Sequence, residues 1–187
     1  MVEFPVRHLG VYTAADSSTS LCIGPTAVWR QELRQWKLSR HQLDSLPCHF
    51  ATDSTYQDAL GRLHHLHLVG TDSLRDTWLE QDTIFNLAGS RAGHLRKFQG
   101  RYYLNTPETG AGEWQVQRLT ITGRRLLWQT LGQDTLRLLA LDAATVRRQP
   151  RSGAATFRLA PAAGQQTRRV GSYAGLWVTA DEFARRH

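Results

Sequence analysis

The stretch LRKFQGRYYLN, residues 95–105, combines side chains that bind anions with side chains that stack on flat rings. Arginine and lysine make charge-assisted hydrogen bonds to carboxylates and phosphates. Neighbouring tyrosines in an extended strand point to opposite faces, so one ring enters the core and the other can stack on a ligand. We therefore predict a ligand-binding or partner-binding surface, with simple strand packing as the alternative, at Arg96, Lys97, Arg101, Tyr103 and Trp114.

Two further groups of residues raise the question of catalysis or metal binding. His65 and His67 share one face of an expected strand, with His64 on the other, and a metal site would need a third ligand. Four acidic residues near Trp78 are expected to form a solvent-exposed face, although two of them could meet as a carboxylate pair: Asp72, Asp76, Glu80 and Asp82. The sequence contains no G-x-S-x-G, H-E-x-x-H or phosphate-binding motif. We predict no catalytic residue, no metal and no cofactor, and hence not an enzyme.

Charge is distributed unevenly along the 187 residues, whose formal net charge is +7. Residues 1–90 contain seven basic and ten acidic side chains, whereas residues 91–187 contain sixteen basic and six acidic ones. A positive half attracts anionic partners, although an arginine-rich surface can also be merely solvated. Basic and aromatic residues alternate in KFQGRYY, but no known nucleic-acid module surrounds them. We expect an anionic or protein partner rather than a nucleic acid.

The chain contains no apolar run of the roughly 18–20 residues that a membrane helix needs. Its first residues have neither the basic start nor the apolar stretch of a signal peptide. We expect a protein that stays where it is made, or a mature form. Cys22 and Cys48 lack C-x-x-C or metal spacing, and we expect both to be apolar core residues rather than a disulfide.

The two halves of the chain contain similar patterns. Gly10-Val11-Tyr12 resembles Gly100-Arg101-Tyr102, and Leu21, Ile23 and Trp29 match three later residues, Leu119, Ile121 and Trp128. The offset grows from about 90 to 98–99 residues, consistent with an inserted loop at 105–113. We predict an internal repeat in which the paired tryptophans fill the core.

Short alternating segments separated by turn residues predict an antiparallel meander. The clearest are 62–70, 73–80 and 82–89, and residues 28–39 are a weaker strand. A strand over 114–121 would need a bulge near Gln117-Arg118 to put all its apolar residues on one side. We expect short helices within 134–148 and 160–169, and a terminal one at 180–186 because Thr179 and Glu182 form a capping-box pattern.

Together these patterns predict a mainly β protein, an antiparallel meander sandwich or a barrel-like fold with few short helices. Its two related halves would span residues 1–93 and 94–187, packed as one compact unit, with the terminal helix in the second half. The tryptophans could instead line the interior of a barrel, so the alternative function is a carrier of a small apolar ligand.

The segment QDTIFNLAGSRAGHLRKFQGRYYLN, residues 81–105, resembles small envelope proteins of Bacteroidota, many of them expected lipoproteins. In that family a DTLF strand precedes an LRKFKGxYFLN segment, then a tryptophan and an RLTI-like strand. The counterparts here are 82–85, 95–105, Trp114 and 118–121, with weaker likeness at 9–21 and 70–74. The resemblance implies a non-catalytic binding or structural protein of the bacterial cell envelope, periplasmic or lipid-anchored. The sequence shows neither the lipid-attachment cysteine nor the leader of that family. If the protein has no leader, we expect it in the cytoplasm.

Overall fold

A computed structural model describes residues 3–46, 49–52, 54–90, 92–108, 114–132, 135–141, 146–149, 156–159 and 164–186. The fold is mainly β and antiparallel, as the sequence predicts, with few short helices. Contacts divide the chain into two units. The N-terminal unit runs to Ala92 and takes back the chain end from Phe183, and the C-terminal unit spans Gly93–Glu182.

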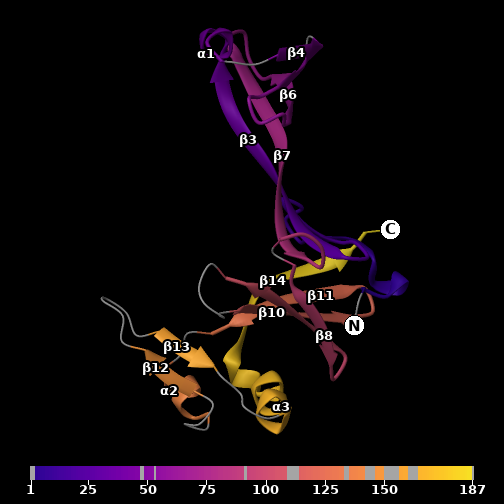
Figure 1. Ribbon diagram of the computed structural model, residues 1–187. Helices are drawn as coiled ribbons and strands as arrows, with labels where there is room; N and C mark the ends of the chain where they lie inside the picture. Colours follow the sequence, from indigo (N-terminus) through magenta and orange to yellow (C-terminus); the bar gives the residue numbers. More distant parts are fainter. Residues whose placement is uncertain are drawn as a thin grey trace. The chain divides into compact units, whose positions relative to one another are not determined.

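The N-terminal unit is a meander with one long two-stranded ribbon. Its strands follow the order β4-β5-β6-β7-β3-β2-β1, and β1 then pairs with the end of β14. Figure 1 shows β3 and β7 running side by side along the ribbon, with α1 and β4 near one end of it. The elements are η1 (Val6–His8), β1 (Gly10–Ala14), β2 (Thr19–Ile23), β3 (Ala27–Ser39), α1 (Arg40–Asp44), β4 (His49–Thr52), β5 (Thr55–Gln57), β6 (Leu63–Leu68) and β7 (Ser73–Asn86).

Local sequence explains how this ribbon begins and ends. The segments expected at 73–80 and 82–89 form one continuous strand, β7, because β3 pairs with it from Ala27 to Ser39. At the end of β3, Ser39 and Gln42 form a capping box that starts α1. Leu43 and Leu46 then pack against a small apolar core of Leu38, Tyr56 and Leu66.

The C-terminal unit places β14, β11, β10, β9 and β8 side by side in that order. A separate two-stranded sheet pairs β12 with β13. The elements are β8 (His94–Phe98), β9 (Arg101–Pro107), β10 (Trp114–Thr122), β11 (Arg125–Leu131), α2 (Thr135–Leu139), β12 (Val146–Gln149), β13 (Thr156–Leu159), α3 (Gly164–Ser172), η2 (Ala174–Leu176) and β14 (Trp177–Arg185). Both strand orders are open, so the described strands of neither unit form a closed barrel.

The expected terminal helix at 180–186 is wrong, because these residues belong mostly to β14. Glu182, which would complete the capping box, instead forms an ion pair with Arg125 of β11. The strand ladder therefore overrides the local capping pattern. The helices expected within 134–148 and 160–169 are represented by the short α2 and by α3.

No bulge interrupts β10, which pairs in one register with β9 and with β11. Its two faces are both covered: Leu119 on one side is fully buried, and Arg118 on the other is 4% exposed. The prediction of a bulge assumed that only one side of the strand faces a core. A second cluster, built on Tyr103, Leu138, Leu141, Leu176 and Trp177, covers the other side.

The residues of the predicted repeat occupy partly matching positions. Tyr12 pairs with Leu21, and Tyr102 pairs with Leu119, and all four are fully buried. The tryptophans do not match. Trp29 lies opposite Cys22, whereas Trp128 lies opposite Leu119, which is the counterpart of Leu21 in the repeat. The repeat stays a prediction. Cys22 is a buried free thiol, and Cys48 lies outside the described residues.

Among the described residues, no helix has both the length and the apolar character that crossing a membrane requires.

Candidate functional site

The strands of the C-terminal unit gather four of the five predicted site residues on one sheet face. Register pairs Arg96 with Tyr103 and Tyr103 with Arg118, and residues directly opposite each other share a face. Alternation along the strands adds Arg101 and Trp114 to the same side. We call this side, with Arg96, Arg101, Tyr103, Trp114 and Arg118, the arginine face.

Lys97 lies on the opposite side of β8 from Arg96. It pairs with Tyr102, and its ammonium lies 5.5 Å from the centre of that ring, within cation–π range. The structure therefore separates Lys97 from the other predicted site residues. Basic residues that are adjacent in the sequence point to opposite faces once the strand forms.

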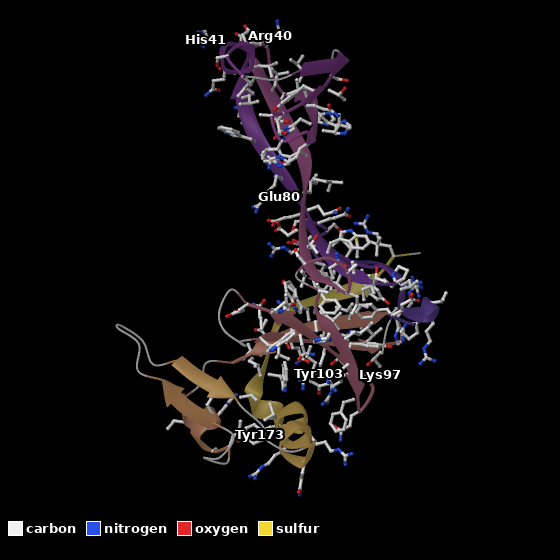
Figure 2. All side chains as sticks on the ribbon, in the orientation of Figure 1. Arg40, His41, Glu80, Lys97, Tyr103 and Tyr173 are labelled. Carbon is white, nitrogen blue, oxygen red and sulfur yellow. The ribbon has the colours of Figure 1, made fainter. Side chains whose placement is uncertain are left out.

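Tyr103 is buried at the centre of the arginine face rather than open for stacking on a ligand. Its ring meets Trp177 edge to face at 5.6 Å, and its hydroxyl donates to the Gly171 carbonyl at 3.0 Å. A Cβ at Gly171 would lie 3.1 Å from that hydroxyl, so the close approach of α3 favours glycine. Figure 2 labels Tyr103 and Tyr173, which both belong to this apolar cluster.

Arg118 is the buried cation of the same face, and sequence patterns did not identify it. Its Nη1 donates to the Gly171 carbonyl at 3.0 Å, and its Nε donates to Gln129 Oε1 at 2.9 Å. The guanidinium also stacks over Trp177, 4.4 Å from the ring centre. Arg118 thereby caps the last turn of α3, where a positive charge complements the helix dipole.

The arginine face is positive where β8, β9, β10 and α3 form it. Burial lowers the pKa of Arg118, and the charge of nearby Arg101 lowers it further, while Tyr103 opposes the shift. Strands β8, β9 and β10 and helix α3 contain no acidic residue, and α3 adds exposed Arg168 and Arg169. Among the described residues, neither Arg96 nor Arg101 forms an ion pair. Arg96 and Arg101 therefore have no acidic partner among the described residues.

Trp114 lies at the edge of this face and is partly exposed. Its ring lies 5.1 Å from that of His94, tilted by 36°. The pair supplies flat apolar area next to the arginines, the combination that binds partners with both rings and charge.

A second constellation, buried in the N-terminal unit, has the residue types of acid–base chemistry. His64 of β6 is 5% exposed and Asp76 of β7 is 1% exposed. His64 Nδ1 lies 2.8 Å from Asp76 Oδ2, and the Tyr56 hydroxyl donates to the same oxygen at 2.7 Å. Asp76 was expected on an exposed acidic face, and the structure instead buries it as the acceptor for two side chains.

Aromatic rings enclose the imidazole of His64 on both sides. Tyr56 stacks on it at 4.5 Å and Trp78 at 4.8 Å, with interplanar angles of 24° and 25°. We call Tyr56, His64, Asp76 and Trp78 the histidine cluster. His64 Nε2 is buried, lying 3.4 Å from Asp58 Oδ2 without hydrogen-bond geometry. This nitrogen therefore has almost no solvent exposure.

Asp58 and Arg62 close the outer side of the histidine cluster. Burial raises the pKa of Asp58, but hydrogen bonds from the Arg62 backbone and side chain and from the Leu60 N–H lower it to about 2. The Arg62 guanidinium lies 2.6 Å from Asp58 and 5.9 Å from the centre of the Trp78 ring. The cluster is thus sealed by an ion pair.

His65 and His67 both point away from this cluster and are exposed. The described residues contain no group of three or more His, Cys, Asp or Glu side chains that could hold a metal ion. One sequence signal could have identified His64. It has the parity of Leu66 on its own strand, and on the neighbouring strand Asp76 and Trp78 also share one parity, so one face can bring all of them together.

Comparison of the chain with protein-family models, with curated proteins and with solved structures finds no match.

Proposed function

We propose that the protein is a non-catalytic binding protein whose C-terminal unit takes an anionic partner on the arginine face. One observation carries the proposal: Arg96 and Arg101 lie on strands that contain no acidic residue, and among the described residues neither forms an ion pair. Arginines that have no counter-ion in their own fold are suited to carboxylates or phosphates of a partner. A location in the bacterial cell envelope is part of the proposal and is supported by the sequence resemblance alone.

Arg118 strengthens the argument for an anion at this position. Its charge is buried and compensated only by neutral acceptors, and its pKa is lowered by burial and further by the charge of nearby Arg101. A negative group bound beside Arg101 would relieve the repulsion between the two guanidinium groups. The attraction between this negative group and the two arginines acts across a partly buried region, where screening by salt is weaker than on an open surface.

The histidine cluster supports a non-catalytic reading of the N-terminal unit. A general acid or base must reach the proton it transfers, directly or through one water. In His64 one ring nitrogen is engaged by Asp76 and the other is buried beside Asp58. The geometry serves to hold β5, β6 and β7 together.

Adjacent residues on β8 provide a matched test. Arg96→Gln and Lys97→Gln each remove one exposed positive charge, but only Arg96 lies on the arginine face. We expect Arg96→Gln to weaken binding to immobilised heparin by about two- to fivefold and the double variant Arg96→Gln/Arg101→Gln by about tenfold. Lys97→Gln should change retention much less.

Retention that falls equally in Arg96→Gln and Lys97→Gln would contradict the proposal, because it would show a response to net charge alone. Unchanged retention in the double variant would contradict it as well. Far-ultraviolet circular dichroism of each variant should match the parent chain, since both side chains are exposed or partly exposed.

A further inference from the structure

The ribbon of the N-terminal unit has two faces with different characters. On one face lie the small core of Leu38, Tyr56 and Leu66 and the histidine cluster. The other face is formed by the alternate residues of β3, β7 and β6. Across its middle, register places Leu33 opposite Leu79 and Leu79 on the same level as Leu63.

These three leucines form an exposed apolar row on adjacent strands. Leu33 is 50% exposed, Leu79 is 58% exposed and Leu63 is 46% exposed. Single exposed leucines are ordinary, but an aligned group is typical of a surface that a partner covers. The small core and the histidine cluster lie on the opposite face of the sheet, and these three leucines take part in neither.

A basic row lies on the same face, about 13 Å further along the strands. It consists of Lys37, Arg75 and His67, which the ladder again places side by side. All three are exposed, and among the described residues none forms an ion pair. Between the two rows lie groups that can donate or accept hydrogen bonds: Gln35, Thr77 and His65.

The strands sort charge between the two faces of the ribbon. The acidic residues of β3 and β7, which are Glu32, Asp76, Glu80 and Asp82, all have the parity of the packed face. Several of them are neutralised there, because Arg34 pairs with Glu32 and Glu80, and Arg30 pairs with Asp82. The open face carries no carboxylate from β3, β6 or β7 although residues 1–90 are acidic as a whole.

We infer that this open face, with its leucine row and basic row, docks an acidic amphipathic segment of a partner protein. Apolar side chains of the segment would cover Leu33, Leu79 and Leu63, and carboxylates would meet Lys37 and Arg75. A second copy of the chain fits less well, because the acidic residues of its ribbon already have partners on the other face: Glu32, Glu80 and Asp82 pair with arginines, and Asp76 pairs with His64. The surface lies on a different unit from the arginine face and does not depend on the proposed function.

The probe is a fluorescently labelled peptide in which leucine alternates with glutamate, titrated with the full chain and followed by anisotropy. Two peptides of equal length serve as references, one with lysine for glutamate and one with alanine for leucine. We expect saturable binding of the leucine–glutamate peptide, at least about tenfold tighter than either reference.

Paired variants assign the binding to this face. Leu33→Ser/Leu79→Ser should weaken binding by about tenfold or more, and Lys37→Gln/Arg75→Gln by about fivefold at low salt, less at high salt. Arg7→Gln/Arg40→Gln is the matched charge control, since both side chains are exposed in the same unit but neither belongs to this face. Arg96→Gln/Arg101→Gln, on the other unit, should weaken peptide binding much less than Leu33→Ser/Leu79→Ser does.

Several results would overturn the inference. They are absence of saturable binding, equal affinity for the glutamate and lysine peptides, and equal loss in the Arg7→Gln/Arg40→Gln control. Sedimentation that shows a dimer of the parent chain, lost in Leu33→Ser/Leu79→Ser, would assign the face to a second copy instead. Binding to vesicles of phosphatidylglycerol that the leucine variant abolishes, without binding of the peptide, would assign it to a lipid surface.

Discussion

Each unit buries a polar constellation beneath aromatic rings, but the two compensate it in opposite ways. In the N-terminal unit, His64 meets the carboxylate of Asp76 at 2.8 Å, with Asp58 on the far side of the ring. In the C-terminal unit, Arg118 meets only neutral acceptors, the Gly171 carbonyl and Gln129, and the face of Trp177. A guanidinium stays charged in proteins, so Arg118 retains its full positive charge when buried.

The difference follows from what each element can offer. The final turn of α3 presents carbonyl oxygens with no partner within the helix, and a cation at that end is favourable. The strands β5, β6 and β7 use their carbonyls in the ladder, so a buried polar side chain there needs another side chain as partner. The histidine cluster is therefore closed on itself, whereas the arginine face keeps net positive charge toward its surroundings.

The largest effect is expected from removing the carboxylate of the histidine cluster. Asp76→Ala leaves the His64 Nδ1 and the Tyr56 hydroxyl without their buried acceptor, and breaking a buried pair in this way costs about 3–5 kcal/mol. Hydrogen exchange should show the loss in the amides of β6 and β7, with β9 and β10 little changed. Asp82→Ala is the control, because its exposed pair with Arg30 contributes about 0–1 kcal/mol.

Equal destabilisation by Asp76→Ala and Asp82→Ala would contradict the comparison, since it would make the buried pair no more important than a surface pair.

A smaller effect is expected from Arg118→Met. Methionine keeps the contact with Trp177 and removes a buried charge, while Gly171 retains the Tyr103 hydroxyl as a donor. The recovered desolvation energy offsets only part of the cost of the lost hydrogen bonds. We therefore expect the free energy of unfolding measured at the amides of α3 and β10 to fall by about 1–2 kcal/mol. Exchange of those amides measures it. A loss as large as that of Asp76→Ala would show that neutral acceptors hold a buried charge as firmly as a carboxylate does.

The fold class followed from sequence because alternation and turn residues report strands directly. Local patterns failed where tertiary contacts decide: the capping-box residues of 180–186 lie in β14, and β10 needs no bulge because both of its faces are covered. For the site, the prediction grouped Arg96, Lys97 and Arg101 by their closeness in sequence, whereas the β8–β9 register puts Arg96 and Arg101 on one face and Lys97 on the other. Alternation also could not bring Asp76 to His64, because that contact depends on the β6–β7 register.

The smallest effect concerns the outer carboxylate of the histidine cluster and depends on pH. The pKa of Asp58, about 2 in the folded chain, lies below its ordinary value of 3.8. The resulting stabilisation is complete above the ordinary value and is lost as the pH falls through about 2. Asp58→Asn should therefore lower the thermal midpoint slightly near neutral pH, and the difference should shrink as the solution is acidified. Arg62→Gln, which removes the ion-pair partner of Asp58, should reduce the same pH dependence of the thermal midpoint. If the difference in thermal midpoint between Asp58→Asn and the parent chain stays constant or grows on acidification, this ion pair does not stabilise the cluster.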